Sequence, residues 1–127
     1  MAGGAAFEDI FVMLKSVFGK HVKHLHVKTD TGTDYTLLSR RPSPFPQHKG
    51  QPMYFGQVRL GKAYVAFHLM PLYMNDELTG TISPELKKRM QGKTCFNFKT
   101  APEPELIAEL ERLTSAGYEN FHEKTWV

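Results

Sequence analysis

The sequence predicts an α+β fold: a two-layer sandwich in which helices pack on one face of a mainly antiparallel sheet of about five strands. Two runs rich in aromatic and branched residues, 54–59 and 63–69, lie on either side of a tight glycine turn, which is typical of a β-hairpin. Apolar residues recur at helical spacing near both ends of the chain. The expected helices and strands do not alternate strictly, so antiparallel pairing with helices on one face is favoured.

Composition indicates one soluble globular domain spanning residues 1–127. Apolar residues make up 41% of the chain and charged residues 23%, which is ordinary for a folded domain. The apolar runs are too short to cross a membrane, and the first residues do not resemble a secretory signal. The single cysteine, Cys95, cannot form an internal disulfide and fits a reducing compartment. We therefore expect a cytoplasmic protein with no membrane partner.

The first third of the chain is expected to form a helix followed by a hairpin. Residues 5–18 carry apolar side chains at helical spacing, and Gly19 follows where a helix commonly ends. Residues 23–28 and 35–39 then flank a turn-rich link at residues 29–34, which would join two antiparallel strands. The apolar face of this helix should pack on the sheet.

The remaining elements surround the central hairpin. Residues 41–52 contain four prolines and should form the main loop. After the hairpin, residues 71–80 indicate an irregular connection. The pair Ser83-Pro84 then predicts the start of a short helix over residues 84–91. Residues 94–98 alternate as a fifth strand would, and residues 103–116 form a closing amphipathic helix with a glycine just beyond its end.

Charge is distributed unevenly along the chain, whose net charge is +3. Residues 15–62 hold nine Lys or Arg against two Asp, whereas residues 101–127 hold six Glu against two basic residues. The simplest explanation is that these charges solvate different faces and partly neutralise each other. Nucleic-acid binding would require the basic residues to gather on one face beside aromatic side chains. They are spread over several predicted elements, so a nucleic-acid partner is not favoured.

Two pairs of residues are candidate metal ligands. His24 and His26 alternate across Leu25, so on a strand both would lie on one face and could bind a transition metal with a third ligand from elsewhere. Glu105 and Glu109 are four residues apart on the closing helix and offer the oxygen ligands that hard cations prefer. In both pairs the alternative is a set of solvated polar side chains.

Polar residues within apolar strands indicate a candidate ligand pocket. Asn97 and His68 stand in strongly apolar runs, and a buried polar group must find a hydrogen-bond partner. They either hold loops in place or line a pocket beside Tyr54, Tyr64 and Tyr73, whose rings would form its walls.

Two further hypotheses concern Cys95 and the C-terminal tail. Neighbouring strands could bring the Cys95 thiol next to His68, which would allow a thiol-dependent enzyme. The alternative is a buried cysteine with a high thiol pKa and little reactivity. Phe121 and Trp126 make the tail aromatic, so it either docks on its own domain or packs against a second copy in a homodimer.

Several motifs follow one another from Gly50 onward: Gly50-x-Pro52-x-Tyr54, the hairpin with Lys62-Ala63-Tyr64-Val65-Ala66-Phe67-His68, Ile82-Ser83-Pro84-Glu85-Leu86, Gly92-Lys93-Thr94-Cys95-Phe96-Asn97-Phe98, and the closing helix. This order, over residues 50–117, resembles the YdhG-like domain of unknown function (number 1801), which is grouped with frataxin-like and YjbR-like folds. The resemblance implies a small cytoplasmic α+β domain. Some relatives are described as frataxin-like proteins that bind iron and deliver it for iron–sulfur cluster assembly, so iron is the cofactor that the resemblance implies.

Taken together, the sequence favours a non-enzymatic cytoplasmic domain that binds a small ligand, a metal or a protein partner. Frataxin-like iron binding and a thiol-dependent enzyme using Cys95 and His68 are the alternatives.

Overall fold

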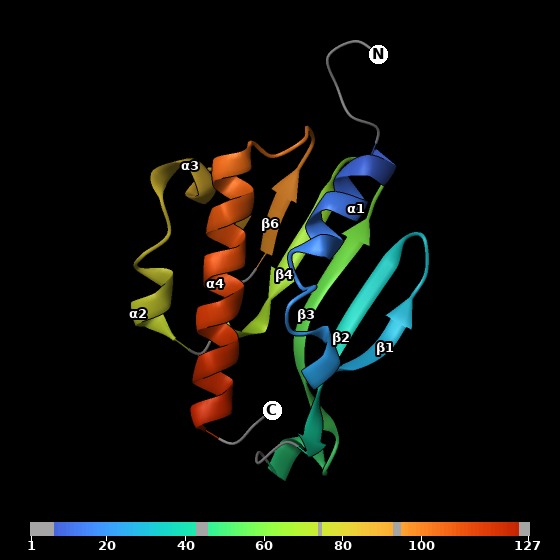
Figure 1. Ribbon diagram of the computed structural model, residues 1–127, viewed down its shortest axis with the longest axis vertical. Coiled ribbons are helices and arrows are strands. Elements are labelled where there is room, and N and C mark those ends of the chain that lie inside the picture. Colours follow the sequence, from blue (N-terminus) through green and yellow to red (C-terminus); the bar gives the residue numbers. More distant parts are fainter. Residues whose placement is uncertain (1–6, 43–45, 74, 93–94, 125–127) are drawn as a thin grey trace.

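Six antiparallel strands form one sheet in the order β1-β2-β3-β4-β6-β5 in a computed structural model of the protein, which describes residues 7–42, 46–73, 75–92 and 95–124 (Figure 1). Every neighbouring pair in the sheet is antiparallel. The strands are β1 (His26–Asp30), β2 (Asp34–Pro42), β3 (Pro52–Leu60), β4 (Val65–Leu69), β5 (Met90–Gln91) and β6 (Cys95–Phe98).

The two long helices, α1 (Phe7–Ser16) and α4 (Pro104–Glu123), lie on the same face of the sheet, in front of it in Figure 1. The short helices α2 (Asp76–Thr79) and α3 (Pro84–Lys87) lie beside α4. Three single turns of 3₁₀-helix complete the fold: η1 (Val22–His24), η2 (Pro46–His48) and η3 (Met70–Leu72). The predicted fold class, a two-layer α+β sandwich with helices on one face, is confirmed, although the sheet has six strands and not five.

The core lies between the two long helices and the sheet because each strand alternates its side chains between two faces. In β4, Val65, Phe67 and Leu69 are fully buried, whereas Ala66 and His68 are only half-buried. The same alternation in β6 buries Phe96 and Phe98 and leaves Cys95 and Asn97 half-buried on the opposite face. This opposite face, which none of the described helices covers in Figure 1, is called the open face below.

An aromatic cluster joins the segment after α1 to the sheet. The Phe18 ring stacks on Phe67 with 5.0 Å between centroids and meets Phe55 edge-on at 6.2 Å. Gly56 makes this contact possible, since a Cβ atom there would lie 2.6 Å from the Phe18 ring. Phe55 in turn meets Phe121 of α4 edge-on at 5.8 Å, so the cluster links both helical ends of the chain to β3 and β4.

The central hairpin forms as predicted, whereas the first hairpin starts later than expected. β3 and β4 pair from Gly56 with Leu69 to Leu60 with Val65. The strand expected at residues 23–28 begins only at His26, because the preceding residues close the 3₁₀ turn η1 through a hydrogen bond from Leu25 N–H to the Val22 carbonyl. The premise that His24 and His26 share one strand is therefore wrong.

The helix predicted at residues 84–91 is also shorter than expected and ends at Lys87. Ser83 caps it, with Oγ accepting from the Leu86 N–H at 3.2 Å. Beyond it, Met90 and Gln91 pair with Phe96 and Cys95 as the additional strand β5. Edge pairing with β6 thus overrides the helical pattern in this segment.

The closing helix is longer than predicted and continues through Gly117 to Glu123. Gly117 packs against η3, where a Cβ atom would lie only 2.6 Å from the Pro71 Cβ. The glycine therefore serves close packing and does not end the helix. Among the described residues, no helix is both long and apolar enough to cross a membrane.

Candidate functional site

A row of polar side chains crosses the open face of the sheet. The antiparallel registers place Thr36 opposite Gln57, Gln57 opposite His68, and His68 opposite Cys95. Side chains at paired positions lie on the same face of a sheet, so these four residues from β2, β3, β4 and β6 form one continuous row. The adjacency of His68 and Cys95 that the sequence suggested is present in the fold.

The β2 end of this row is held by hydrogen bonds to one carboxylate. Asp34 Oδ1 accepts from Thr36 Oγ1 at 2.6 Å and from Gln57 Nε2 at 3.0 Å. Tyr54 donates its hydroxyl to Gln57 Oε1 at 2.8 Å, and its ring lies 5.4 Å from the His68 ring. Burial, together with the charges of Asp34 and Cys95, raises the pKa of Tyr54, so the phenol stays a hydrogen-bond donor. Hydrogen bonds therefore fix the side chains at this end of the row.

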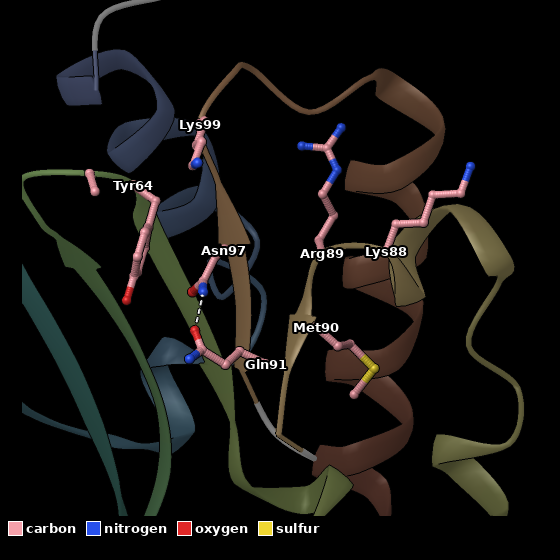
Figure 2. Close-up of a pocket in the computed structure, with 8 residues that line it drawn as sticks. Tyr64, Lys88, Arg89, Met90, Gln91, Asn97 and Lys99 are labelled. Atoms are coloured by element: carbon pink, nitrogen blue, oxygen red, sulfur yellow. Dashed lines mark hydrogen bonds between the residues drawn. The ribbon is translucent and has the colours of Figure 1, made fainter.

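A second group of hydrogen bonds ties β5 to β6. Asn97 Nδ2 donates to Gln91 Oε1 at 2.6 Å (Figure 2). Asn97 Oδ1 accepts from Cys95 Sγ at 3.5 Å. The Asn97 backbone N–H also donates to the Arg89 carbonyl at 2.8 Å. Asn97 therefore fixes the position of the short edge strand and presents its amide on the open face.

Two neighbouring hollows open on either side of Tyr64. The first, with a volume of about 510 Å³, is lined by Ala63, Tyr64, Lys88, Arg89, Met90, Gln91, Asn97 and Lys99 (Figure 2). The second, of about 620 Å³, is lined by Arg59, Leu60, Gly61, Lys62, Ala63, Tyr64, Ala66 and Cys95. We refer to the two hollows together as the basic trough, because Tyr64 and Ala63 belong to both.

The lining of the basic trough carries positive charge only. Five of its side chains are cationic, and none of the lining residues is Asp or Glu: Arg59, Lys62, Lys88, Arg89 and Lys99. Lys88 forms an exposed ion pair with Glu85, with 3.5 Å between Nζ and Oε1. Within the described residues, no other lining cation forms an ion pair. Arg89 is instead positioned over the Phe98 ring, 5.4 Å from its centroid.

The structure brings together some of the predicted pocket residues and separates one. Tyr64 and Asn97 line the first hollow, and Tyr54 contacts His68 farther along the open face. Tyr73 lies beyond η3, is 63% exposed, and lines neither hollow of the trough. The pocket residues predicted from the sequence thus fall into two groups, and Tyr73 belongs to neither.

Cys95 lies at the second hollow, but its surroundings do not activate it. Burial raises the pKa of the Cys95 thiol and lowers the pKa of His68, so both groups favour their neutral forms. A nucleophilic cysteine requires the opposite shift, which an ion pair with a protonated histidine would give.

This arrangement predicts slow alkylation of Cys95. In the native protein at pH 7, iodoacetamide should react with Cys95 more slowly than with free cysteine, and the pH at which the rate is half-maximal should lie above that of the free amino acid. The direction follows from the raised pKa, since less thiolate is present at any pH below it. Reaction faster than free cysteine would restore the thiol-enzyme hypothesis.

The four candidate metal ligands lie at different places in the fold. His24 belongs to η1 and contacts the Tyr118 ring of α4 at 5.9 Å, whereas His26 is an exposed residue of β1. Glu105 is exposed in the first turn of α4. Glu109 accepts from both the N–H and the hydroxyl of Ser83, at 2.7 and 2.6 Å, and so helps to anchor α3.

These four residues are dispersed over η1, β1 and the first half of α4. In the part of the chain that the structure describes, no three His, Cys, Asp or Glu side chains are placed to hold one metal ion. His24 contacts Tyr118 near the end of α4, whereas Glu105 and Glu109 occupy the first half of that helix. At the rise of an α-helix, Tyr118 is about 20 Å from Glu105 and about 14 Å from Glu109 along the axis.

The cations of the trough were not recognised as a site from the sequence. They come from the end of β3, the β3–β4 turn, the segment after α3 and the residue after β6, which are not all near one another in sequence. Only the pairing of β5 with β6 and of β4 with β6 brings them together. The run Lys87-Lys88-Arg89 is a local concentration of charge in the sequence, but such a run is typical of a solvated helix end.

Comparison of the chain with models of protein families, with curated proteins and with solved structures found no match in any of the three.

Proposed function

We propose that the protein is a non-enzymatic binding domain for a small organic anion, which it holds in the basic trough. The observation that carries the proposal is the gathering of five cationic side chains, with no acidic residue among them, around two hollows that share Tyr64. Hollows of this size accept molecules of a few to a few tens of atoms. A concentration of one sign of charge attracts ligands of the opposite sign.

The chemistry of the lining supports an anion that also carries an apolar part. Lys99 and Arg89 can donate charge-assisted hydrogen bonds to a carboxylate or phosphate group. The Tyr64 ring offers apolar surface, and the amides of Asn97 and Gln91 offer orienting hydrogen bonds. Figure 2 shows Tyr64, Lys99, Asn97 and Gln91 grouped around β6, whereas the Arg89 and Met90 side chains point away from Tyr64. A metal cation would be repelled by the same lining.

This proposal refines the expectation of a domain that binds a small ligand, a metal or a protein partner. The neutral state favoured by Cys95 and His68 supports binding over covalent catalysis. The single cysteine remains the support for a cytoplasmic location. Membership of the YdhG-like family remains a prediction from the motif order.

The proposal predicts saturable binding of benzoate and of phenyl phosphate, measured by isothermal titration calorimetry at low salt. Lys99→Gln and Arg89→Gln should each weaken binding about two- to fivefold, and the double variant about tenfold, because each substitution removes one positive charge from the lining. Lys87→Gln is the matched control, since Lys87 is exposed on α3 and does not line the trough. Its affinity should stay within about twofold of the unsubstituted protein.

Two results would overturn the proposal. One is the absence of saturable binding for either anion at low salt. The other is an equal loss of affinity in the Lys87→Gln control and the Lys99→Gln variant, which would indicate a nonspecific attraction to the net positive charge.

A further inference from the structure

A third hollow, separate from the basic trough, lies beside the last turns of α4. It has a volume of about 320 Å³ and is lined by His24, Arg40, Arg41, Tyr118 and His122. These residues come from η1, from β2 and from α4, three elements that meet only in the folded chain. The lining contains two guanidinium groups and two imidazoles and no carboxylate. We call it the histidine hollow.

Stacked rings give the histidine hollow a defined shape. The Tyr118 ring stacks on His122 with 6.0 Å between centroids and an interplanar angle of 13°, and it meets His24 at 5.9 Å. Its closest stacking partner is His21, at 4.7 Å and 21°. His21 is itself held by Ser115, whose Oγ lies 3.1 Å from His21 Nε2. The tyrosine therefore orders the two imidazoles that line the hollow.

Arg40 is positioned by the backbone and keeps donors for a ligand. Its Nε atom donates to the Leu25 carbonyl at 3.3 Å, which fixes the direction of the guanidinium group. Within the described residues, its two terminal nitrogens make no hydrogen bond or ion pair. A planar guanidinium with two adjacent N–H groups directed to one side matches the oxygens of a tetrahedral oxyanion.

We infer that the histidine hollow is a second anion site, which binds a sulfate- or phosphate-type group between Arg40, His24 and His122. A guanidinium group is charged at every accessible pH, and an imidazole that takes up a proton on acidification gains positive charge. The site should therefore bind more tightly at pH 6 than at pH 8. It is independent of the basic trough, with which it shares no lining residue.

Other charged groups surround the hollow and do not set this pH dependence. Lys23 belongs to η1 and Lys20 precedes it, while Glu119, Glu123 and Lys124 lie on or next to the last turns of α4. The reference pKa values of lysine and glutamate side chains lie outside the range from pH 6 to pH 8. Burial lowers the pKa of His21, against the raising effect of Glu119, so its imidazole stays neutral over more of this range and acts as the support for Tyr118.

Titration with sodium sulfate tests the inference, because sulfate keeps its charge between pH 6 and pH 8. NMR should show saturable shifts of the His24 and His122 ring protons, with affinity several-fold higher at pH 6 than at pH 8. His122→Gln should weaken binding at pH 6 several-fold and reduce its pH dependence, and Arg40→Gln should weaken it about tenfold at both pH values. The four lining residues other than Tyr118 are exposed, so these variants should fold.

The matched control is Lys23→Gln, which removes an exposed charge next to His24 without changing the lining. Its sulfate affinity should change less than twofold. The inference is overturned if sulfate does not saturate the histidine shifts, if affinity is the same at pH 6 and pH 8, or if Lys23→Gln and Arg40→Gln weaken binding equally. Lys99→Gln should leave this titration unchanged.

Discussion

Replacing Phe18 by alanine should destabilise the protein by about 3–5 kcal/mol, the range for removing a large aromatic side chain from a packed core. Phe18 is fully buried and touches three other aromatic rings, those of Tyr35, Phe55 and Phe67. Because the Phe18 side chain joins the segment after α1 to the sheet, the loss should appear in the free energy of unfolding by urea. Phe18→Leu, which keeps most of the volume, should cost less.

The contact between Phe18 and Gly56 can be measured by a double-mutant cycle. Gly56→Ala alone should cost about 1–3 kcal/mol, since its Cβ would lie 2.6 Å from the Phe18 ring. In the Phe18→Ala background the cost should fall by about 1 kcal/mol or more, because the ring is absent. Gly32→Ala is the control, as a Cβ there meets nothing within 4 Å. Strict additivity of the two substitutions would contradict the packing described here.

Glu109→Ala should lower the free energy of unfolding by about 2 kcal/mol, because it leaves two donors of Ser83 without their acceptor. The Glu109 side chain is only 12% exposed and also lies 3.7 Å from Arg112. Glu105→Ala is the matched control, since Glu105 is exposed one turn earlier on the same helix. Its effect should stay within about 0.5 kcal/mol.

The comparison also separates a structural role from a metal-binding role for these glutamates. If Glu105 and Glu109 acted together as cation ligands, ferrous iron would raise the stability of the unsubstituted protein and either substitution would abolish that increase. The hydrogen bonds of Glu109 predict instead an unequal effect on stability in the absence of metal. Equal and small effects of the two substitutions would contradict this assignment.

Local sequence patterns were sufficient for the elements whose neighbours in space are also neighbours in sequence. The β3–β4 hairpin follows from its alternation and its glycine turn, and β6 follows from the alternation of Cys95 to Phe98. The patterns failed where contacts with residues distant in the sequence determine the local structure. Met90 and Gln91 form a strand because β6 lies beside them. Gly117 lies inside α4 and does not end it, because the glycine packs closely against Pro71.

The same distinction applies to the candidate sites. Tyr64 and Asn97 were predicted because polar and aromatic residues within apolar strands are visible in the sequence, and they do line one hollow. Arg89 and Lys99 were not predicted, since surface cations are common and only the order of strands brings these two together. His24 was proposed as a strand residue, but a 3₁₀ turn places it against Tyr118.

The central claim is that the basic trough binds a small organic anion. The most direct test follows the side-chain amides of Asn97 and Gln91 by ¹H–¹⁵N NMR. The protein is titrated with phenyl phosphate and, separately, with neutral benzyl alcohol. Asn75 serves as the internal reference, because its side chain caps α2 and does not line the trough. The account predicts saturable shifts of the Asn97 and Gln91 amides with phenyl phosphate, much weaker shifts with benzyl alcohol, and an unchanged Asn75. Equal responses to the two compounds, or shifts of Asn75 as large as those of Asn97, would contradict it.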